Sequence, residues 1–243
     1  MWRSPKSRPT TTLSDSTPTS PGGGLFAPQG CIDQAGRRRA GLAAACLAVL
    51  AIAFTVAVQL EAFASLDQSV RQWLAAIRTD SGMALMLAIS RMSSEQVTPF
   101  VVLGIGWLIA RRDRTWGKYV VLVTLTSTLW HVGLKPVLDR VRPQPPLVPD
   151  WTGPSYPSGH ALSTLCLVLA LGWWISCRSS LAPRARTASR VLLVIWAGLV
   201  AFSRLYIDAH WLTDVLAGLA IGAAHFLFSV HICGRQLVGY SSD

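Results

Sequence analysis

Long blocks of apolar residues alternate with short polar links along most of the chain. The blocks cover approximately residues 40–60, 97–110, 119–134, 161–175, 191–202 and 212–230. A straight transmembrane helix needs about 20 apolar residues, so the pattern predicts an integral membrane bundle of six helices, with 191–202 as its weakest member. We expect the second block to begin earlier, between residues 95 and 100, and the fifth to draw on residues 185–190.

Residues 61–95 mix polar and apolar positions. Apolar residues recur there at helical spacing, in the two sets Leu66, Val70, Trp73 and Leu85, Ile89, Met92. This amphipathic pattern predicts one or two short helices lying at the extracytoplasmic membrane surface.

The two ends of the chain are polar. Residues 1–36 are rich in Ser, Thr, Pro and Gly, so they cannot bury enough apolar surface to fold, and we predict a disordered cytoplasmic tail. The predicted all-α membrane domain then covers residues 37–234, and residues 235–243 form a short cytoplasmic tail. A cleaved secretory signal is the competing interpretation of the block 40–60, because Ala62-Phe63-Ala64 resembles a cleavage site. The block is longer than a signal core and starts late, which favours an uncleaved helix.

Composition supports the membrane class. Apolar residues make up 51% of the chain and charged residues only 14%, against about 25% charged in soluble domains. The net charge of +10 could suggest nucleic-acid binding, but most basic residues lie in the short links, and no zinc-finger or stacking-aromatic pattern occurs. The five cysteines include no CxxC pair, so neither a disulfide framework nor a metal site is indicated.

The basic residues also orient the bundle. They gather in alternate links, as the groups Arg37, Arg38, Arg39; Arg111, Arg112, Arg114, Lys118; Arg178, Arg184, Arg186, Arg190; and Arg235. Because cytoplasmic loops carry excess Lys and Arg, both termini are predicted to be cytoplasmic. Three polar motifs at the ends of the blocks then share the extracytoplasmic side and can form one site.

The first motif is KPVLDRVRP, residues 135–143. Lys135 and Arg142 are seven residues apart, which places them on one face if the helix continues for two turns. Both are cations that suit a phosphate, and Pro143 ends any helix there. The alternative is a basic helix end that faces lipid headgroups.

The second motif, Pro157-Ser158-Gly159-His160, opens the fourth apolar block. A helix N-terminus binds anions through its free N–H groups, and Gly159 lets a phosphate approach the backbone. His160 would lie beside that anion and could donate a proton. An ordinary Ser cap followed by a structural histidine is the alternative.

The third motif runs from Ser203 to Asp214. His210 and Asp214 are four residues apart and are expected to stack on one helix face, where the carboxylate can orient the imidazole. Arg204 adds a third cation near the start of that helix. The alternative is an ordinary surface pair, which is weakened because polar residues beside membrane spans are costly and usually functional.

Together the motifs resemble the three-part signature of the type 2 phosphatidic acid phosphatase (PAP2) family, which is akin to the vanadium haloperoxidases and bacterial acid phosphatases. The resemblance covers about residues 61–230. It implies that His210 attacks phosphorus to form a phospho-histidine, that Asp214 orients it and that His160 protonates the leaving oxygen. It further implies metal-independent catalysis without a cofactor, and a set of groups that hold the phosphate: Lys135, Arg142, Ser158, Gly159 and Arg204.

Two positions depart from the commonest pattern of the family. Asp208 stands where a glycine is frequent, and we expect it to face solvent, the alternative being that it raises the pKa of a histidine. Thr213 lies at a variable position. His131, His225 and His231 match no motif position and are interpreted as structural, although His131 lies one turn before Lys135 and is open to a supporting role.

The predicted activity is hydrolysis of a lipid phosphomonoester or diphosphate in the bacterial inner membrane, with phosphatidic acid, phosphatidylglycerol phosphate and undecaprenyl diphosphate as candidates. The partners are the lipid substrate and the bilayer, without nucleic acid or metal. A phosphotransferase using a lipid acceptor is the main alternative. A peroxidase is disfavoured by the spans, and a non-enzymatic lipid-binding or transport bundle leaves the His210–Asp214 pair without a purpose. The lipid and the oligomeric state stay open.

Overall fold

The chain is all-helical in the parts that the structure, a computed structural model, describes, which are residues 32–148, 153–178 and 180–238. Eight α-helices lie in these ranges: α1 (Gln34–Gln59), α2 (Ala64–Ile77), α3 (Asp80–Met92), α4 (Thr98–Ala110), α5 (Arg114–Leu138), α6 (Gly159–Arg178), α7 (Pro183–Tyr206) and α8 (Leu212–Val238). Helices satisfy every backbone group internally, as lipid requires. Of the two predicted tails, residues 1–31 and 239–243 lie outside the described residues, whereas α1 already begins at Gln34 and α8 continues to Val238.

Within the described residues, five helices are long and apolar enough to cross a membrane, namely α1, α5, α6, α7 and α8. The predicted count of six is therefore not matched. The short element is α4, whose 13 residues span about 20 Å, less than the roughly 30 Å of a hydrocarbon core. The prediction that residues 191–202 are the weakest span is wrong, because α7 extends back to Pro183 and reaches 24 residues.

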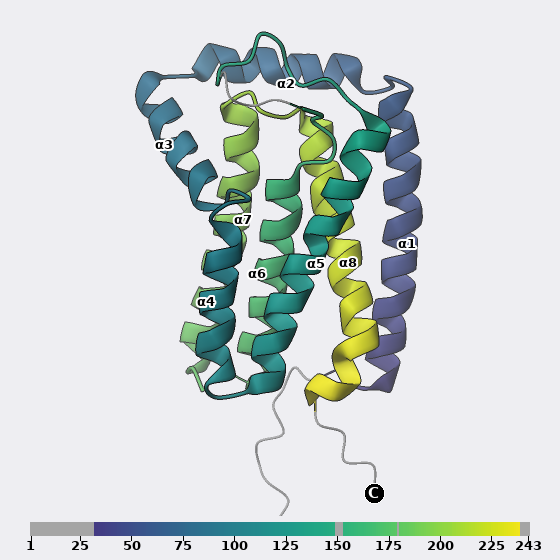
Figure 1. Cartoon of the computed structure of the whole chain (residues 1–243), viewed down its shortest axis with the longest axis vertical. Coiled ribbons are helices and arrows are strands. Elements are labelled where there is room, and N and C mark those ends of the chain that lie inside the picture. Colours follow the sequence, from purple (N-terminus) through teal and green to yellow (C-terminus); the bar gives the residue numbers. More distant parts are fainter. Residues whose placement is uncertain (1–31, 149–152, 179, 239–243) are drawn as a thin grey trace, which may run out of the picture.

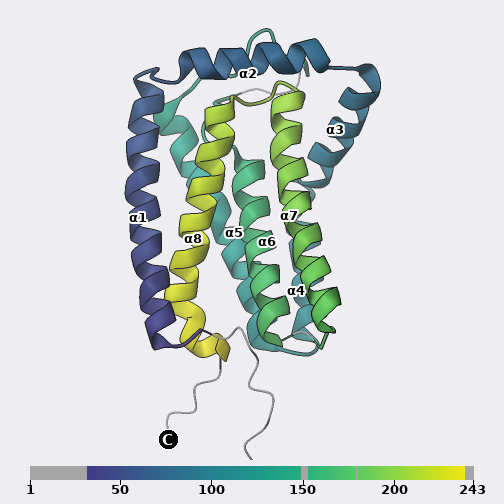
Figure 2. The ribbon, with the colours of Figure 1, turned by 180° about the vertical axis from the view of Figure 1, so that it is seen from behind.

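Helix α6 lies at the centre of the bundle and contacts α5, α7 and α8, while α1 packs along α8 (Figures 1 and 2). Two glycines on α8 allow its close approach to α6. A Cβ on Gly218 would lie 2.5 Å from the carbonyl oxygen of Ser158, and one on Gly222 would lie 2.8 Å from that of Leu162. Small residues one turn apart bring backbones together in membrane bundles, and here they join the start of α6 to the start of α8.

An aromatic cluster fills the core near the start of α5. Trp116, Tyr119 and Trp173 make edge-to-face contacts with ring centroids 4.9–5.7 Å apart, and Phe226 extends the cluster. The fully buried Trp116 anchors this end of the bundle. The polar motifs lie at the opposite end, where α5 finishes and α6 and α8 begin.

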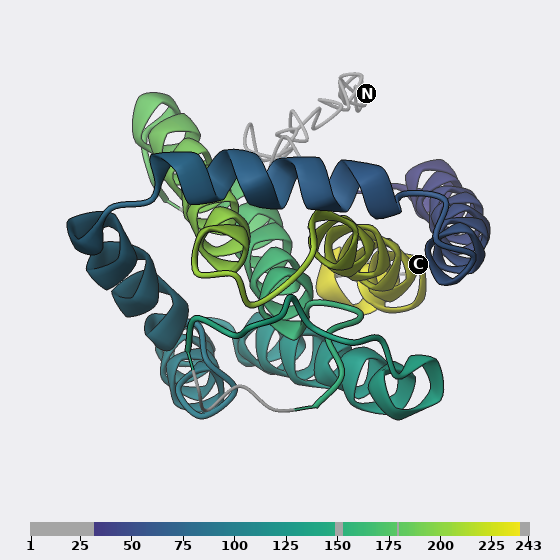
Figure 3. The ribbon, with the colours of Figure 1, turned by 90° about the horizontal axis from the view of Figure 1, so that it is seen from above.

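Residues 61–95 form α2 and α3. Helix α2 crosses the end of the bundle and contacts α7 and α8 (Figure 3), whereas α3 turns back alongside α7. The predicted apolar stripe of α2 points away from the bundle, since Leu66 and Trp73 are 45% and 58% exposed. Asp67 and Leu74 lie two helical turns apart on another face, and each is only 2% exposed. The face of α2 that carries Asp67 therefore covers the motif end of the bundle.

Candidate active site

The three motifs meet in one cavity of about 550 Å³ at the end of the bundle. Six of the eight predicted site residues line it: Lys135, Arg142, Gly159, His160, Arg204 and His210. The other two, Ser158 and Asp214, are fully buried beside it. Helix α3 and the loop after it add lining residues that no motif contained: Ser90, Arg91, Ser94 and Glu95.

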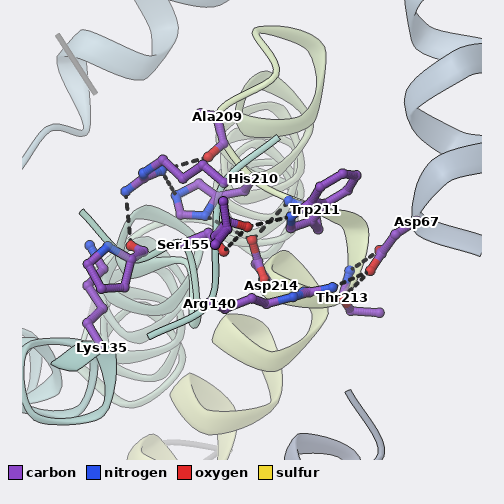
Figure 4. Close-up of polar contacts among 12 residues, drawn as sticks. Asp67, Lys135, Arg140, Ser155, Ala209, His210, Trp211, Thr213 and Asp214 are labelled. Carbon is purple, nitrogen blue, oxygen red and sulfur yellow. Dashed lines mark hydrogen bonds and ion pairs between the residues drawn. The ribbon is translucent and has the colours of Figure 1, made fainter. Parts of the chain in front are cut away.

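His210 and Asp214 pair, but not as neighbours on a helix face. Helix α8 begins at Leu212, so His210 lies in the loop before it and Asp214 lies in its first turn. The Asp214 carboxylate accepts a hydrogen bond from the Trp211 N–H at 2.9 Å, as the acidic residue of a capping box does. The same Oδ2 atom lies 3.4 Å from His210 Nδ1, so helix capping holds the carboxylate against the imidazole (Figure 4).

The other ring nitrogen of His210 faces the guanidinium of Arg142 in the cavity. Its Nε2 lies 3.5 Å from Arg142 Nη1. Burial is the main cause that brings the pKa of His210 well below its ordinary value, and the neighbouring Arg204 and Arg142 act in the same direction. The imidazole is therefore neutral at neutral pH, which is the form that a nucleophile requires.

Arg142 is fixed by backbone carbonyls rather than by a helix. Helix α5 ends at Leu138, and Asp139 caps it in the left-handed conformation with a φ of 38°. The prediction that Arg142 continues the face of Lys135 is wrong for this reason. Instead its guanidinium donates to carbonyl oxygens of Ala209 at 2.6 Å, Gly153 at 3.0 Å and Pro154 at 3.2 Å.

Arg204 reaches the cavity from the last turn of α7, not from the start of the following helix as predicted. Its Nη1 donates a hydrogen bond to Ser90 Oγ on α3. The backbone carbonyl of Arg204 accepts hydrogen bonds from the N–H groups of Ala209 and His210. This residue thus ties α3 and the loop of residues 207–211, which carries His210, to one point beside the cavity.

The second motif opens α6, which starts at Gly159. The Ser158 N–H donates to the backbone oxygen of Asp214 at 3.0 Å, which joins the second motif to the third. Ser158 Oγ is buried and has no hydrogen-bond partner among the described residues, as suits a group that awaits a phosphate oxygen. Glycine is required at 159 by packing as well, because a Cβ would lie 2.9 Å from the ring of His131.

Glu95 and His131 form a support that the motifs did not predict. Glu95 Oε1 lies 3.1 Å from His131 Nε2 and 3.9 Å from Lys135 Nζ. The pKa of Glu95 falls to about 2, chiefly because of the hydrogen bond from His131. His131 therefore contacts the carboxylate that also faces Lys135, a position that fits the supporting role left open by the sequence. Only the acidic character of Glu95 at the edge of an apolar block could have signalled it.

The prediction that Asp208 faces solvent is wrong. It adopts a left-handed φ of 58°, a conformation that glycine favours, and its side chain is buried. Both of its oxygens accept hydrogen bonds from Arg71 on α2, at 2.8–3.0 Å. The extra carboxylate is thus neutralised by the helix that covers the site.

Arg140 and Asp67 are the most connected residues that sequence reasoning missed. Arg140 Nη1 lies 2.5 Å from Asp214 Oδ1, and its Nη2 lies 2.7 Å from Asp67 Oδ2 on α2. Thr213 is fully buried and donates its hydroxyl to Asp67 at 2.6 Å. Arg140 lies inside the first motif, so its position could have identified it as a candidate site residue. Asp67 lies in the amphipathic segment, where no motif distinguishes it.

The other two histidines, His225 and His231, do not line this cavity. His225 Nδ1 accepts a hydrogen bond from the indole of Trp130 at 3.1 Å. His231 Nδ1 lies 2.9 Å from the backbone oxygen of Arg37, which links α8 to α1. Both contacts are within the helical part of the bundle.

A family model, curated proteins and solved structures all match this chain. Residues 116–237 match the model of the PAP2 superfamily. The chain is 29% identical over 174 residues to phosphatidylglycerophosphatase B of Bacillus subtilis, covering 70% of this chain and 84% of that protein. It is 32% identical over 160 residues to an undecaprenyl-diphosphatase of Sulfolobus acidocaldarius, covering 61% of this chain and 69% of that protein.

A solved structure shares the fold. The crystal structure of a transmembrane PAP2-type phosphatidylglycerolphosphate phosphatase from Bacillus subtilis matches with a TM-score of 0.69 and 25% identity, covering 76% of this chain and 93% of that one. The superfamily range of 116–237 contains all three motifs, whereas α2 and its residues Asp67 and Arg71 lie outside it.

Proposed function

Because the chain belongs to the PAP2 superfamily, we propose that it is an integral membrane phosphatase that hydrolyses a lipid phosphomonoester or diphosphate through a phospho-histidine. One observation carries the proposal: the three cations, His160 and the His210–Asp214 pair converge on a single cavity. Phosphoryl transfer depends mainly on positioning and on stabilising negative charge, and this set of side chains supplies both.

In the first step, His210 Nε2 attacks the phosphorus. The N–P bond forms as the bond from phosphorus to the lipid oxygen breaks, and His160 gives that oxygen its proton. Asp214 holds Nδ1 and stabilises the positive charge that the ring acquires, which is the role of the carboxylate in a catalytic triad. Lys135, Arg142 and Arg204, together with the Ser158 hydroxyl and the Gly159 N–H, hold the three phosphoryl oxygens.

In the second step, water attacks the phosphorus of the phospho-histidine. His160, now neutral, accepts the proton of that water, the N–P bond breaks, and inorganic phosphate leaves with His210 restored. The proton that His160 lost in the first step is regained in the second, so the enzyme returns to its starting state.

We place the site at the extracytoplasmic face and both termini in the cytoplasm of a bacterial cell. The alternate basic links support this orientation. The start of α1 and the end of α8 lie at the same end of the bundle (Figure 1), which requires an even number of crossings. We therefore propose that the short α4, with α3 stacked above it, makes a sixth crossing.

Phosphatidylglycerol phosphate is the first substrate to test, because the Bacillus subtilis relative that aligns with 70% of this chain bears that activity in its name. Undecaprenyl diphosphate follows from the Sulfolobus acidocaldarius relative, and phosphatidic acid completes the panel. A phosphotransferase would pass the phosphoryl group to a lipid acceptor from the same intermediate, so a labelled acceptor must be included.

The test is phosphate release by the purified full chain in detergent, with and without EDTA and vanadate. We expect release from at least one of these lipids in EDTA, inhibition by vanadate, and loss of activity in His210→Ala. His225→Ala is the matched control, because His225 lies on α8 and does not line the cavity. Full activity of His210→Ala, or no release from any lipid, would contradict the proposal.

A further inference from the structure

Arg140 connects two buried carboxylates that come from opposite ends of the domain sequence. Its Nη1 donates to Asp214 Oδ1 at 2.5 Å and to Thr213 Oγ1 at 2.7 Å. Its Nη2 donates to Asp67 Oδ2 at 2.7 Å. The guanidinium is thereby committed to protein partners, and the residues that line the phosphate cavity are other ones.

Asp67 is built into this contact rather than placed on a surface. It lies on α2 and is only 2% exposed. Its carboxylate accepts three hydrogen bonds in all, from the Thr213 N–H at 2.9 Å, the Thr213 hydroxyl at 2.6 Å and the Arg140 guanidinium at 2.7 Å. A buried carboxylate without a cation is strongly destabilising. Asp67 and Arg140 therefore hold each other in place.

The Asp214 carboxylate is fixed at both oxygens. Oδ2 faces the Trp211 N–H and His210 Nδ1, whereas Oδ1 faces Arg140 (Figure 4). With one oxygen held by a guanidinium, rotation of the carboxylate away from the imidazole breaks a charged hydrogen bond. Such bonds are about twice as strong as neutral ones, so Arg140 helps to fix the orientation of Asp214 together with the Trp211 N–H.

We propose that Arg140 and Asp67 are positioning residues for catalysis: Asp67 holds Arg140, Arg140 holds Asp214, and Asp214 orients the nucleophile His210. This inference rests on the proposed function, because the contacts matter for turnover only if His210 forms the phospho-histidine. It makes the covering helix α2 part of the catalytic apparatus, although α2 contributes no residue to the cavity.

A second ion pair provides the matched control. Arg71, four residues after Asp67 on α2, donates hydrogen bonds to both carboxylate oxygens of Asp208, in the loop that contains His210. Its removal loosens α2 from the nucleophile loop just as removal of Asp67 does, but it touches no group of Asp214. A purely structural role for Asp67 and Arg140 predicts equal effects of the two ion pairs on turnover.

The experiment compares Arg140→Gln, Arg140→Lys, Asp67→Asn and Arg71→Gln in the full chain in detergent, on the lipid that the wild type hydrolyses. We expect Arg140→Gln to lower kcat by about 100-fold with KM within about 2-fold, the pattern of an interaction that matters in the transition state. Arg140→Lys and Asp67→Asn should fall between Arg140→Gln and wild type. Arg71→Gln should lower the unfolding temperature while kcat stays within about 3-fold, because the Arg71–Asp208 pair contacts neither Asp214 nor the cavity.

The outcomes separate cleanly. Equal losses of kcat in Arg71→Gln and Asp67→Asn, or a change in KM alone, would overturn the inference. If Arg140→Gln does not fold, Arg140→Lys and Asp67→Asn decide it by the same comparison of kcat with unfolding temperature. If the wild type is active, His210→Ala is inactive and Arg140→Gln is fully active, the positioning role of Arg140 and Asp67 is rejected while the proposed function stands.

Discussion

Gly218→Ala tests whether close packing of two membrane helices assembles the site. Gly218 lies on α8 one turn after Asp214, and its missing side chain leaves room for the backbone of α6. A Cβ there would lie 2.5 Å from the carbonyl oxygen of Ser158, a backbone atom that cannot move by itself. The substitution therefore has to push the start of α6 away from the start of α8.

The size of the effect follows from this distance. An ordinary contact begins at 3.4 Å, so the two helices must separate locally by about 1 Å. Inserting a methyl group into a packed core costs about 1–3 kcal/mol. The same shift parts His160 from His210 and stretches the 3.0 Å hydrogen bond from Ser158 N–H to Asp214. A misplacement of about 1 Å can lower turnover by about 100-fold.

The assay is phosphate release and thermal unfolding of purified protein, with Gly172→Ala and Gly198→Ala as controls. A Cβ at either control position meets nothing within 4 Å, so both variants should keep wild-type turnover and unfolding temperature. We expect Gly218→Ala to lose most of its activity and to unfold a few degrees lower. Wild-type kcat in Gly218→Ala would refute the argument that helix contact sets the geometry of the site.

Three further outcomes follow from the site. Glu95→Gln should lower KM about 5-fold at low salt, because the ionised Glu95 carboxylate, 3.9 Å from Lys135 Nζ, competes with the substrate phosphate for that cation. Glu61→Gln, at an exposed residue, is the control, and an unchanged or higher KM in Glu95→Gln would contradict this. Ser158→Ala should lower kcat/KM by about 10-fold without lowering the unfolding temperature, because its hydroxyl has no partner to lose among the described residues; a destabilised variant would show that the hydroxyl is structural. Burial lowers the pKa of His210, so this imidazole should stay neutral below pH 6.5. In a pH–rate profile, the loss of activity caused by protonation of His210 should therefore lie well below pH 6.5. A loss centred at or above pH 6.5 would show that burial does not control the pKa of His210.

The helices were predictable to the extent that hydrophobicity is a local property. The apolar blocks identified α1, α5, α6 and α8, and they identified α7 once residues 185–190 were included. They also located α4, since the block 97–110 matches Thr98–Ala110, but these 13 residues are fewer than a straight span needs. Residues outside a hydrophobic block still extend a helix, so block length is a poor guide to helix length.

The site was predictable as a set of residues but not as a geometry. The motifs contained all six predicted lining residues, and they contained Arg140 without revealing its partner. The expected helical faces for Arg142 and His210 were wrong, because α5 is capped at Asp139 and α8 starts only at Leu212. Both loops nevertheless bring their side chains to the cavity, since carbonyl groups and a helix cap hold them there.

The sequence by itself predicted a membrane bundle with cations and histidines gathered at one end. It could do so because the burial of apolar blocks and the chemistry of cations and imidazoles are properties of nearby residues. Only the tertiary structure decided which face of α2 meets that site. Helical periodicity groups Asp67 with Arg71 and Leu66 with Trp73, but it does not say which group turns inward. The contacts of Asp67 with Arg140 and Thr213 join residues 73 and 146 positions apart, and such a pairing exists only after the bundle has brought those helices together.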